Sequence, residues 1–140
     1  MIGKTATPTR IVTIVLLCYW LALFVGTHSP TLPVGFRHGW DKAAHFASYA
    51  GLAFLLACAF GARARRSILA DLSLLAVVAL YGVVDELLQM AVPGRSAELW
   101  DWAADVCGAA IGLLAYRVLH AAARFVRSST PPIASRDSVL

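Results

Sequence analysis

The chain has 140 residues, of which 59% are hydrophobic and 14% are charged, and its mean hydropathy is +0.71. This composition lies far outside soluble globular usage and predicts an integral membrane protein of one domain. The formal net charge of +4 does not indicate a nucleic-acid partner, because the arginines lie between or after apolar stretches, where they act as topology signals.

Four apolar segments are long enough to cross a bilayer. They cover residues 11–26, 41–60, 68–90 and 99–119. The first segment follows basic residues, which is also the layout of a cleavable signal peptide, but the sequence after it offers only a weak cleavage site and favours an uncleaved helix. The sequence therefore predicts an all-α integral membrane protein with four transmembrane helices.

The predicted organisation is a cytoplasmic N-terminus over residues 1–10, a transmembrane domain over 11–120 and a cytoplasmic tail over 121–140. This tail is predicted to be disordered, because its end is rich in Ser and Pro. Basic residues are concentrated before the first segment, in the turn at 61–66 and after the fourth segment. The positive-inside rule then places both termini in the cytoplasm.

In this orientation the start of the second segment, the end of the third and the start of the fourth share the outer leaflet. Polar residues gather at those ends, and they are Asp41, Lys42, His45, Asp85, Glu86, Gln89, Arg95, Asp101 and Asp105. Because an ionisable side chain at the centre of a bilayer costs about 2.5–3.5 kcal/mol on insertion scales, their convergence predicts an outward-facing polar pocket with a function.

Asp41, His45 and either Ser48 or Tyr49 follow helical spacing and share one face of the second segment. An Asp one turn from a His can fix the tautomer of the imidazole for general acid–base catalysis. Asp41 is also a good helix N-cap, and His45 could serve only as a packed, hydrogen-bonded residue. Both alternatives stay open.

The third segment ends with two adjacent carboxylates, Asp85 and Glu86, which suit proton exchange if both are buried. Alternatively, one of them pairs with Arg95 or Lys42. The catalytic candidates are therefore His45, Asp41, Asp85 and Glu86. The remaining candidates are predicted to bind substrate, with Arg95 and Lys42 holding an anion. These are Lys42, Tyr49, Gln89, Arg95, Asp101 and Asp105.

No two of the acidic and histidine residues form a specific metal signature, so the sequence predicts neither a metal nor a cofactor. His28, His38 and His120 lie in loops or at a helix end and are assigned no role. Cys18, Cys58 and Cys107 lie in apolar stretches and are predicted to be small packing residues. Gly108 and Gly112, with Ala104 and Ala115, form a small-residue stripe for close helix packing.

Three motifs follow one another along the chain in an order and spacing that indicate a family. They are Asp41-Lys42-x-x-His45-Phe46-x-x-Tyr49-x-x-Leu52, then Asp85-Glu86-x-x-Gln89, then Arg95-Ser96 with Asp101-x-x-x-Asp105-x-x-Gly108-x-x-x-Gly112. Over residues 38–115 this pattern resembles the VanZ-like family of small membrane proteins. The chain departs from it at Asp105, where the family often has Asn. The resemblance implies a multi-pass protein of the bacterial inner membrane with an outward-facing polar pocket. The family takes its name from a member linked to teicoplanin resistance.

The leading functional hypothesis is that the pocket binds or acts on an envelope lipid or lipid-linked phosphate. Under this hypothesis the protein could also affect glycopeptide susceptibility. The expected partners are membrane lipids and a lipid-linked envelope precursor, and an oligomer stays open. Catalysis on the same substrate uses the same residues, so the sequence does not decide whether the protein is an enzyme. The alternative is a structural or accessory protein whose polar residues form an interhelical network. A transporter is disfavoured because no span has a central Gly/Pro break flanked by polar residues.

Overall fold

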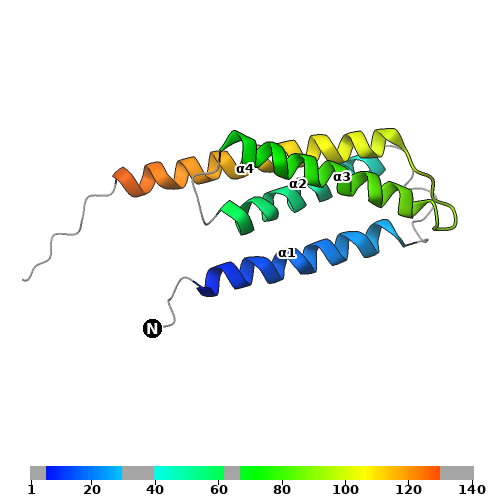
Figure 1. Cartoon of the computed structure of the whole chain (residues 1–140), viewed down its shortest axis with the longest axis horizontal. Coiled ribbons are helices and arrows are strands. Elements are labelled where there is room, and N and C mark those ends of the chain that lie inside the picture. Colours follow the sequence, from blue (N-terminus) through cyan, green and yellow to red (C-terminus); the bar gives the residue numbers. More distant parts are fainter. Residues whose placement is uncertain (1–5, 30–39, 62–66, 130–140) are drawn as a thin grey trace, which may run out of the picture.

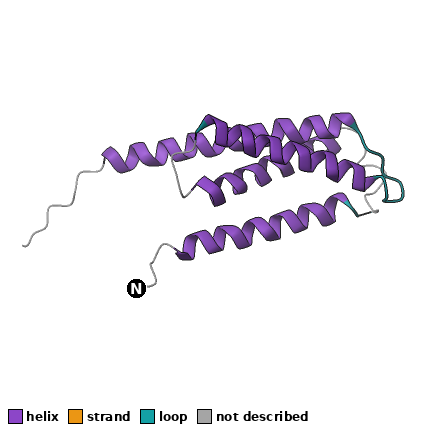
Figure 2. Ribbon diagram, viewed as in Figure 1, coloured by secondary structure: helices purple, strands orange, loops and turns teal. Residues whose placement is uncertain are grey.

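The computed structural model describes residues 6–29, 40–61 and 67–129. These residues form four helices in the order α1 (Ala6–Thr27), α2 (Trp40–Gly61), α3 (Ile68–Gln89) and α4 (Leu99–Ser129). The described ranges contain no strand, so the predicted all-α class is confirmed (Figures 1 and 2). Residues 62–66 of the predicted turn, the end of the tail and His38 lie outside the described residues.

All four helices are long and apolar enough to cross a membrane. At 1.5 Å per residue, each of the 22-residue helices α1, α2 and α3 is about 33 Å long, which matches the roughly 30 Å hydrocarbon core. The predicted four-span membrane protein is confirmed.

Helix α4 is longer than the sequence indicated. The apolar pattern ends near Leu119, yet the 31-residue helix continues to Ser129, so residues 121–129 are helical rather than part of a disordered tail. Residues 121–129 include Ala and Arg, which are both strong helix formers, and their side chains are exposed. Hydropathy thus marks where the chain can leave the membrane, whereas helix propensity decides where the helix ends.

The largest contact in the bundle is between α2 and α4, while α1 packs mainly against α2. Gly108 and Gly112 of α4 face the backbone of α2, and a Cβ atom at either glycine would overlap the carbonyl oxygen of Phe46 or Ala50. The predicted small-residue stripe is therefore a backbone contact between two helices. The two alanines of the stripe are less buried than the glycines, since Ala104 is half-buried and Ala115 is exposed.

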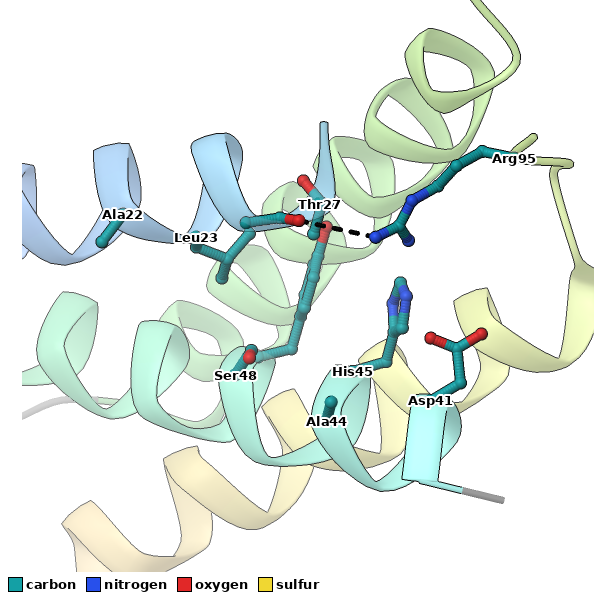
Figure 3. Close-up of a pocket in the computed structure, with 10 residues that line it drawn as sticks. Ala22, Leu23, Thr27, Asp41, Ala44, His45, Ser48 and Arg95 are labelled. Atoms are coloured by element: carbon teal, nitrogen blue, oxygen red, sulfur yellow. Dashed lines mark hydrogen bonds between the residues drawn. The ribbon is translucent and has the colours of Figure 1, made fainter. Parts of the chain in front are cut away.

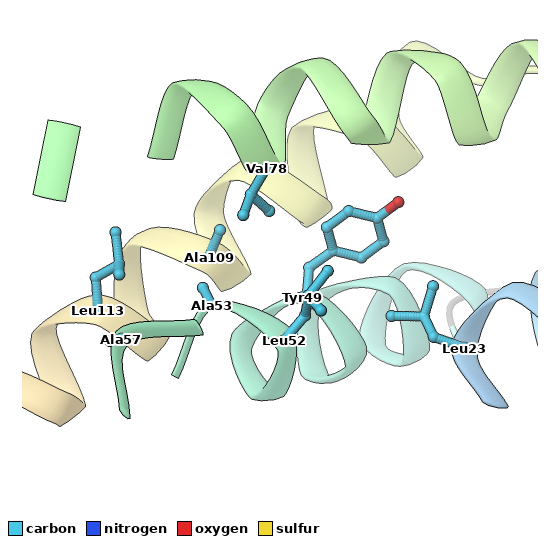
Figure 4. Close-up of a cluster of buried hydrophobic side chains, with 8 residues drawn as sticks. All are labelled: Leu23, Tyr49, Leu52, Ala53, Ala57, Val78, Ala109 and Leu113. Carbon is cyan, nitrogen blue, oxygen red and sulfur yellow. The ribbon is translucent and has the colours of Figure 1, made fainter. Parts of the chain in front are cut away.

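The middle of the bundle is apolar, and Figure 4 shows its side chains meeting between α2, α3 and α4, with one contribution from α1. The buried hydrophobic residues are Leu23, Tyr49, Leu52, Ala53, Ala57, Val78, Ala109 and Leu113. Many other large apolar side chains point outward, including Leu80, 67% exposed, and Ile14, 60% exposed. Exposed apolar surface of this extent is what a lipid-facing helix needs. Cys18 and Cys107 are also exposed, so they are not interior packing residues.

The ends of the helices are arranged as the sequence predicted. In Figure 1, α1 and α3 finish at the same end of the bundle at which α2 and α4 begin. We call this the polar end. Short hydrogen-bonded turns fix the link from α3 to α4 there, with Gly94 at φ 81° and the Arg95 amide donating to the Val92 carbonyl at 3.1 Å. Pro93 and Gly94 suit the second and third positions of such a turn.

Candidate functional site

A histidine and an aspartate form the centre of the polar end. The His45 Nδ1 atom of α2 lies 2.9 Å from the Asp105 Oδ1 atom of α4, and both side chains are buried. One of the alternatives that the sequence left open was that Asp41 orients His45, but in the structure the hydrogen bond to His45 is made by Asp105. The glycine contact explains the difference, because it brings α4 against the face of α2 that carries His45.

Asp85 and Glu86 are both buried, but they turn toward different helices. The Asp85 carboxylate accepts hydrogen bonds from the Thr27 hydroxyl of α1 at 3.1 Å and from the Gln89 amide at 3.0 Å. Glu86 Oε2 accepts the backbone N–H of Glu98 at 2.8 Å, next to the start of α4. A carboxylate at a helix N-terminus is favourable because it meets free N–H groups and the positive end of the helix dipole.

The other oxygen of Glu86 lies close to the central pair. Glu86 Oε1 is 3.9 Å from His45 Nδ1 and has no hydrogen-bond partner within the described ranges. Asp105 Oδ2 is likewise buried and without such a partner. His45, Glu86 and Asp105 therefore form a compact buried group from three helices, which we call the central triad.

Lys42 lies outside the triad and pairs with two carboxylates of the α3–α4 link and α4. Its Nζ atom is 3.1 Å from Glu98 Oε2 and 3.0 Å from Asp101 Oδ1. Asp101 is buried, so this contact ties the start of α2 to the start of α4. Neither Asp85 nor Glu86 pairs with Lys42 or Arg95 in the described part of the chain, contrary to one of the alternatives that the sequence allowed.

Arg95 extends across a pocket between α1 and α2, as Figure 3 shows, with His45 and Asp41 pointing into the same space from α2. The pocket has a volume of about 240 Å³. Its lining consists of Ala22, Leu23, Gly26, Thr27, Asp41, Ala44, His45, Ser48, Tyr49 and Arg95. Arg95 Nη2 makes one long hydrogen bond, of 3.5 Å, to the Gly26 carbonyl. Its guanidinium thus keeps most of its donors for a ligand.

A second cavity, of about 270 Å³, lies among α1, α2 and α3. Its lining is Leu16, Leu17, Trp20, Leu52, Leu56, Val77, Val78 and Tyr81. On α1 this lining ends at Trp20 and the lining of the polar pocket begins at Ala22, so the two cavities follow one another along the same helix.

Comparison with known protein families identifies the family of the chain. A family model described as VanZ/LLP1 matches residues 4–120. The chain belongs to the VanZ/LLP1 family. No curated protein and no solved structure matches the chain. The VanZ/LLP1 match covers all nine polar residues of the converging ends and supports a multi-pass membrane protein, while the last turns of α4 lie beyond it.

The structure also brings in residues of the polar end that sequence reasoning passed over. His28 lies just after α1, with its Nδ1 atom 3.8 Å from Asp85 Oδ1 and its ring stacked on Phe24. Thr27 bonds Asp85, and Glu98 contacts both Lys42 and Glu86. The sequence could have indicated that His28 belongs to this group, because His28 follows the first apolar segment and that segment ends in the same leaflet as the predicted pocket.

Proposed function

We propose that this protein of the bacterial inner membrane binds a phosphate-bearing envelope lipid at its polar end, with that end facing outward. The observation that supports this best is the sequence of two cavities along α1. A polar pocket with an arginine lies at the polar end, and an apolar cavity follows it along α1 toward the middle of the bundle. This order matches a lipid, whose headgroup lies at the surface and whose chains lie below it.

Arg95 is the anion-binding group in this proposal. Its planar guanidinium can hold a phosphate with two parallel hydrogen bonds, and within the described ranges it makes no ion pair. Lys42 is a weaker candidate than the sequence indicated, because two carboxylates already neutralise it. Asp41, whose side chain also faces the pocket, suits an amine or hydroxyl group of the same headgroup.

His45 would give the pocket a second capacity. It lines the pocket and is held by Asp105, which is the arrangement of a general base whose tautomer is fixed by a carboxylate. Hydrolysis or group transfer on the bound lipid is the reaction class that this pair supports. An effect on glycopeptide susceptibility is expected where the lipid carries a cell-wall precursor.

An accessory protein whose polar residues only hold the helices together is the second candidate. The contacts of Lys42 with Glu98 and Asp101, and of Asp85 with Thr27, favour it because they join separate helices. Such a protein would keep no specific lipid, and its variants would lose function only in parallel with stability.

Native mass spectrometry of gently extracted protein tests the proposal. We expect the wild-type protein to retain a phosphate-bearing lipid that Arg95→Ala loses and Arg95→Lys retains more weakly. Arg124→Ala, which removes an exposed arginine of α4 outside the pocket, is the matched control and should retain the lipid. Ala44→Phe should expel the lipid without any change of charge, because Ala44 lines the pocket. Equal lipid retention in all these variants would refute the site.

A further inference from the structure

Among the residues that the structure describes, the polar end carries more carboxylates than permanent cations. The described residues there include six carboxylates, namely Asp41, Asp85, Glu86, Glu98, Asp101 and Asp105, against the two permanent cations Lys42 and Arg95. A buried carboxylate needs a partner, because an isolated ion loses several kcal/mol of solvation. His28 and His45 can add charge only if they are protonated. Within the described residues, this excess favours a bound cation or bound protons.

We propose that the central triad, His45, Glu86 and Asp105, binds a divalent transition-metal ion such as Zn²⁺ or Mn²⁺. One imidazole and two carboxylates are a donor set that these ions accept. One potential ligand atom from each of the three residues lies within 4.8 Å of the other two, and all three residues are buried. The sequence showed no metal signature because the three residues come from three different helices.

The distances fit ligands that share one ion. With metal–ligand bonds of about 2.1 Å, two tetrahedral ligands are about 3.4 Å apart. His45 Nδ1 lies 2.9 Å from Asp105 Oδ1 and 3.9 Å from Glu86 Oε1, on either side of that value. Binding requires His45 to give up its Nδ1 hydrogen bond to Asp105 and to coordinate as the neutral ring, so the metal-bound form replaces the general-base arrangement of His45 and Asp105.

Two unsatisfied oxygen atoms provide an independent reason for a ligand at this place. Glu86 Oε1 and Asp105 Oδ2 are buried without a hydrogen-bond partner in the described part of the chain, and the two side chains are 7% and 0% exposed. Such an atom costs about 1–3 kcal/mol when it is left unpaired. A metal ion at the triad would give Glu86 Oε1 the partner that the described part of the protein does not provide.

A second group, Asp41, His45 and Asp101, is similarly close, but it is a poorer site. Asp101 is already paired with Lys42, and Asp41 is only half-buried. The central triad is also next to the pocket, which His45 lines. Three protein ligands leave a coordination position for a water molecule or a ligand oxygen.

Metal titration of the full-length protein in detergent tests the triad. The protein should carry no affinity tag, and its three cysteines should be replaced by alanine, because thiolates bind zinc. After treatment with a chelator, we expect one Zn²⁺ or Mn²⁺ per chain by elemental mass spectrometry. Glu86→Gln and Asp105→Asn should each weaken binding by at least roughly 100-fold, the upper range seen for loss of mere supporting contacts.

The control variants separate the alternatives. Asp71→Asn changes a buried aspartate of α3 that contacts Arg117, outside the triad, and should bind the ion normally. Asp41→Asn should do so too; loss of binding in Asp41→Asn with normal binding in Glu86→Gln would overturn the assignment. Wild-type protein that is folded and binds neither ion would overturn the proposal itself.

Absorption spectroscopy with Co²⁺ tests the site without any triad variant, so its result does not depend on whether those variants fold. Co²⁺ added to the cysteine-free protein should give the visible absorption of a low-symmetry nitrogen and oxygen site, and Zn²⁺ should abolish it by competition. A spectrum of hydrated Co²⁺ would refute the site. Since no lipid enters these experiments, their outcome is independent of the lipid proposal.

Discussion

Replacing Gly108 by alanine should loosen the bundle at its central contact. The new Cβ would overlap backbone atoms of Phe46, which cannot rotate away as the end of a side chain can. Overpacking costs about 1–3 kcal/mol, and an immovable backbone neighbour places Gly108→Ala near the upper value. Alanine offsets about 1 kcal/mol because it favours the helix over glycine. The net loss is about 2 kcal/mol, or roughly 30-fold in the folding equilibrium.

Unfolding in mixed micelles, followed by circular dichroism as the fraction of sodium dodecyl sulfate rises, measures this loss. Gly26→Ala is the matched control, because a Cβ at Gly26 meets nothing within 4 Å and only the helix preference changes. The two variants should therefore shift in opposite directions. If Gly108→Ala is as stable as Gly26→Ala, the backbones of α2 and α4 are not in contact and the geometry of the central triad fails with them.

Three further outcomes follow from single contacts and from the charge pattern. Tyr19→Phe should cost about 1 kcal/mol in the same unfolding assay, because the Tyr19 hydroxyl donates a 2.9 Å hydrogen bond to a carbonyl of α2; an unchanged midpoint would contradict that bond. Thr27→Val should cost about 1–3 kcal/mol by leaving an oxygen of buried Asp85 unpaired, whereas Thr27→Ser should be tolerated. In a cysteine-free background, a membrane-impermeant maleimide added to intact cells should label Ser96→Cys, which lies at the polar end. Ser129→Cys, at the far end of α4, should react only after the cells are permeabilised. The reverse labelling pattern would contradict the predicted orientation of the protein in the membrane.

The helices could be predicted because their signal is local. An apolar run of membrane length and the absence of strands follow from composition and periodicity, and the shared end follows from chain direction. The end of α4 could not be placed in this way. Hydropathy changes near Leu119, whereas the backbone responds to helix propensity and continues to Ser129.

The members of the polar end could be predicted, but their pairings could not. Spacing within one helix suggested that Asp41 orients His45, since they lie one turn apart. The actual partner, Asp105, comes from another helix and depends on the packing of α2 against α4. The glycine stripe predicted a close helix contact, but not which helix fills it. The actual partners of Lys42, Glu98 and Asp101, could not be recognised for the same reason.

The distinction between a structural network and a binding site rests on what the network leaves unsatisfied. A purely structural role accounts for Lys42 and Asp85, whose charged groups are matched by partners from other helices. It does not account for Arg95, which crosses the pocket with one long hydrogen bond, or for the buried free oxygens of Glu86 and Asp105. A network that served packing alone would gain stability by satisfying or removing these groups. Their retention at an end of the described bundle where a pocket meets buried carboxylates is best explained by a ligand that completes them.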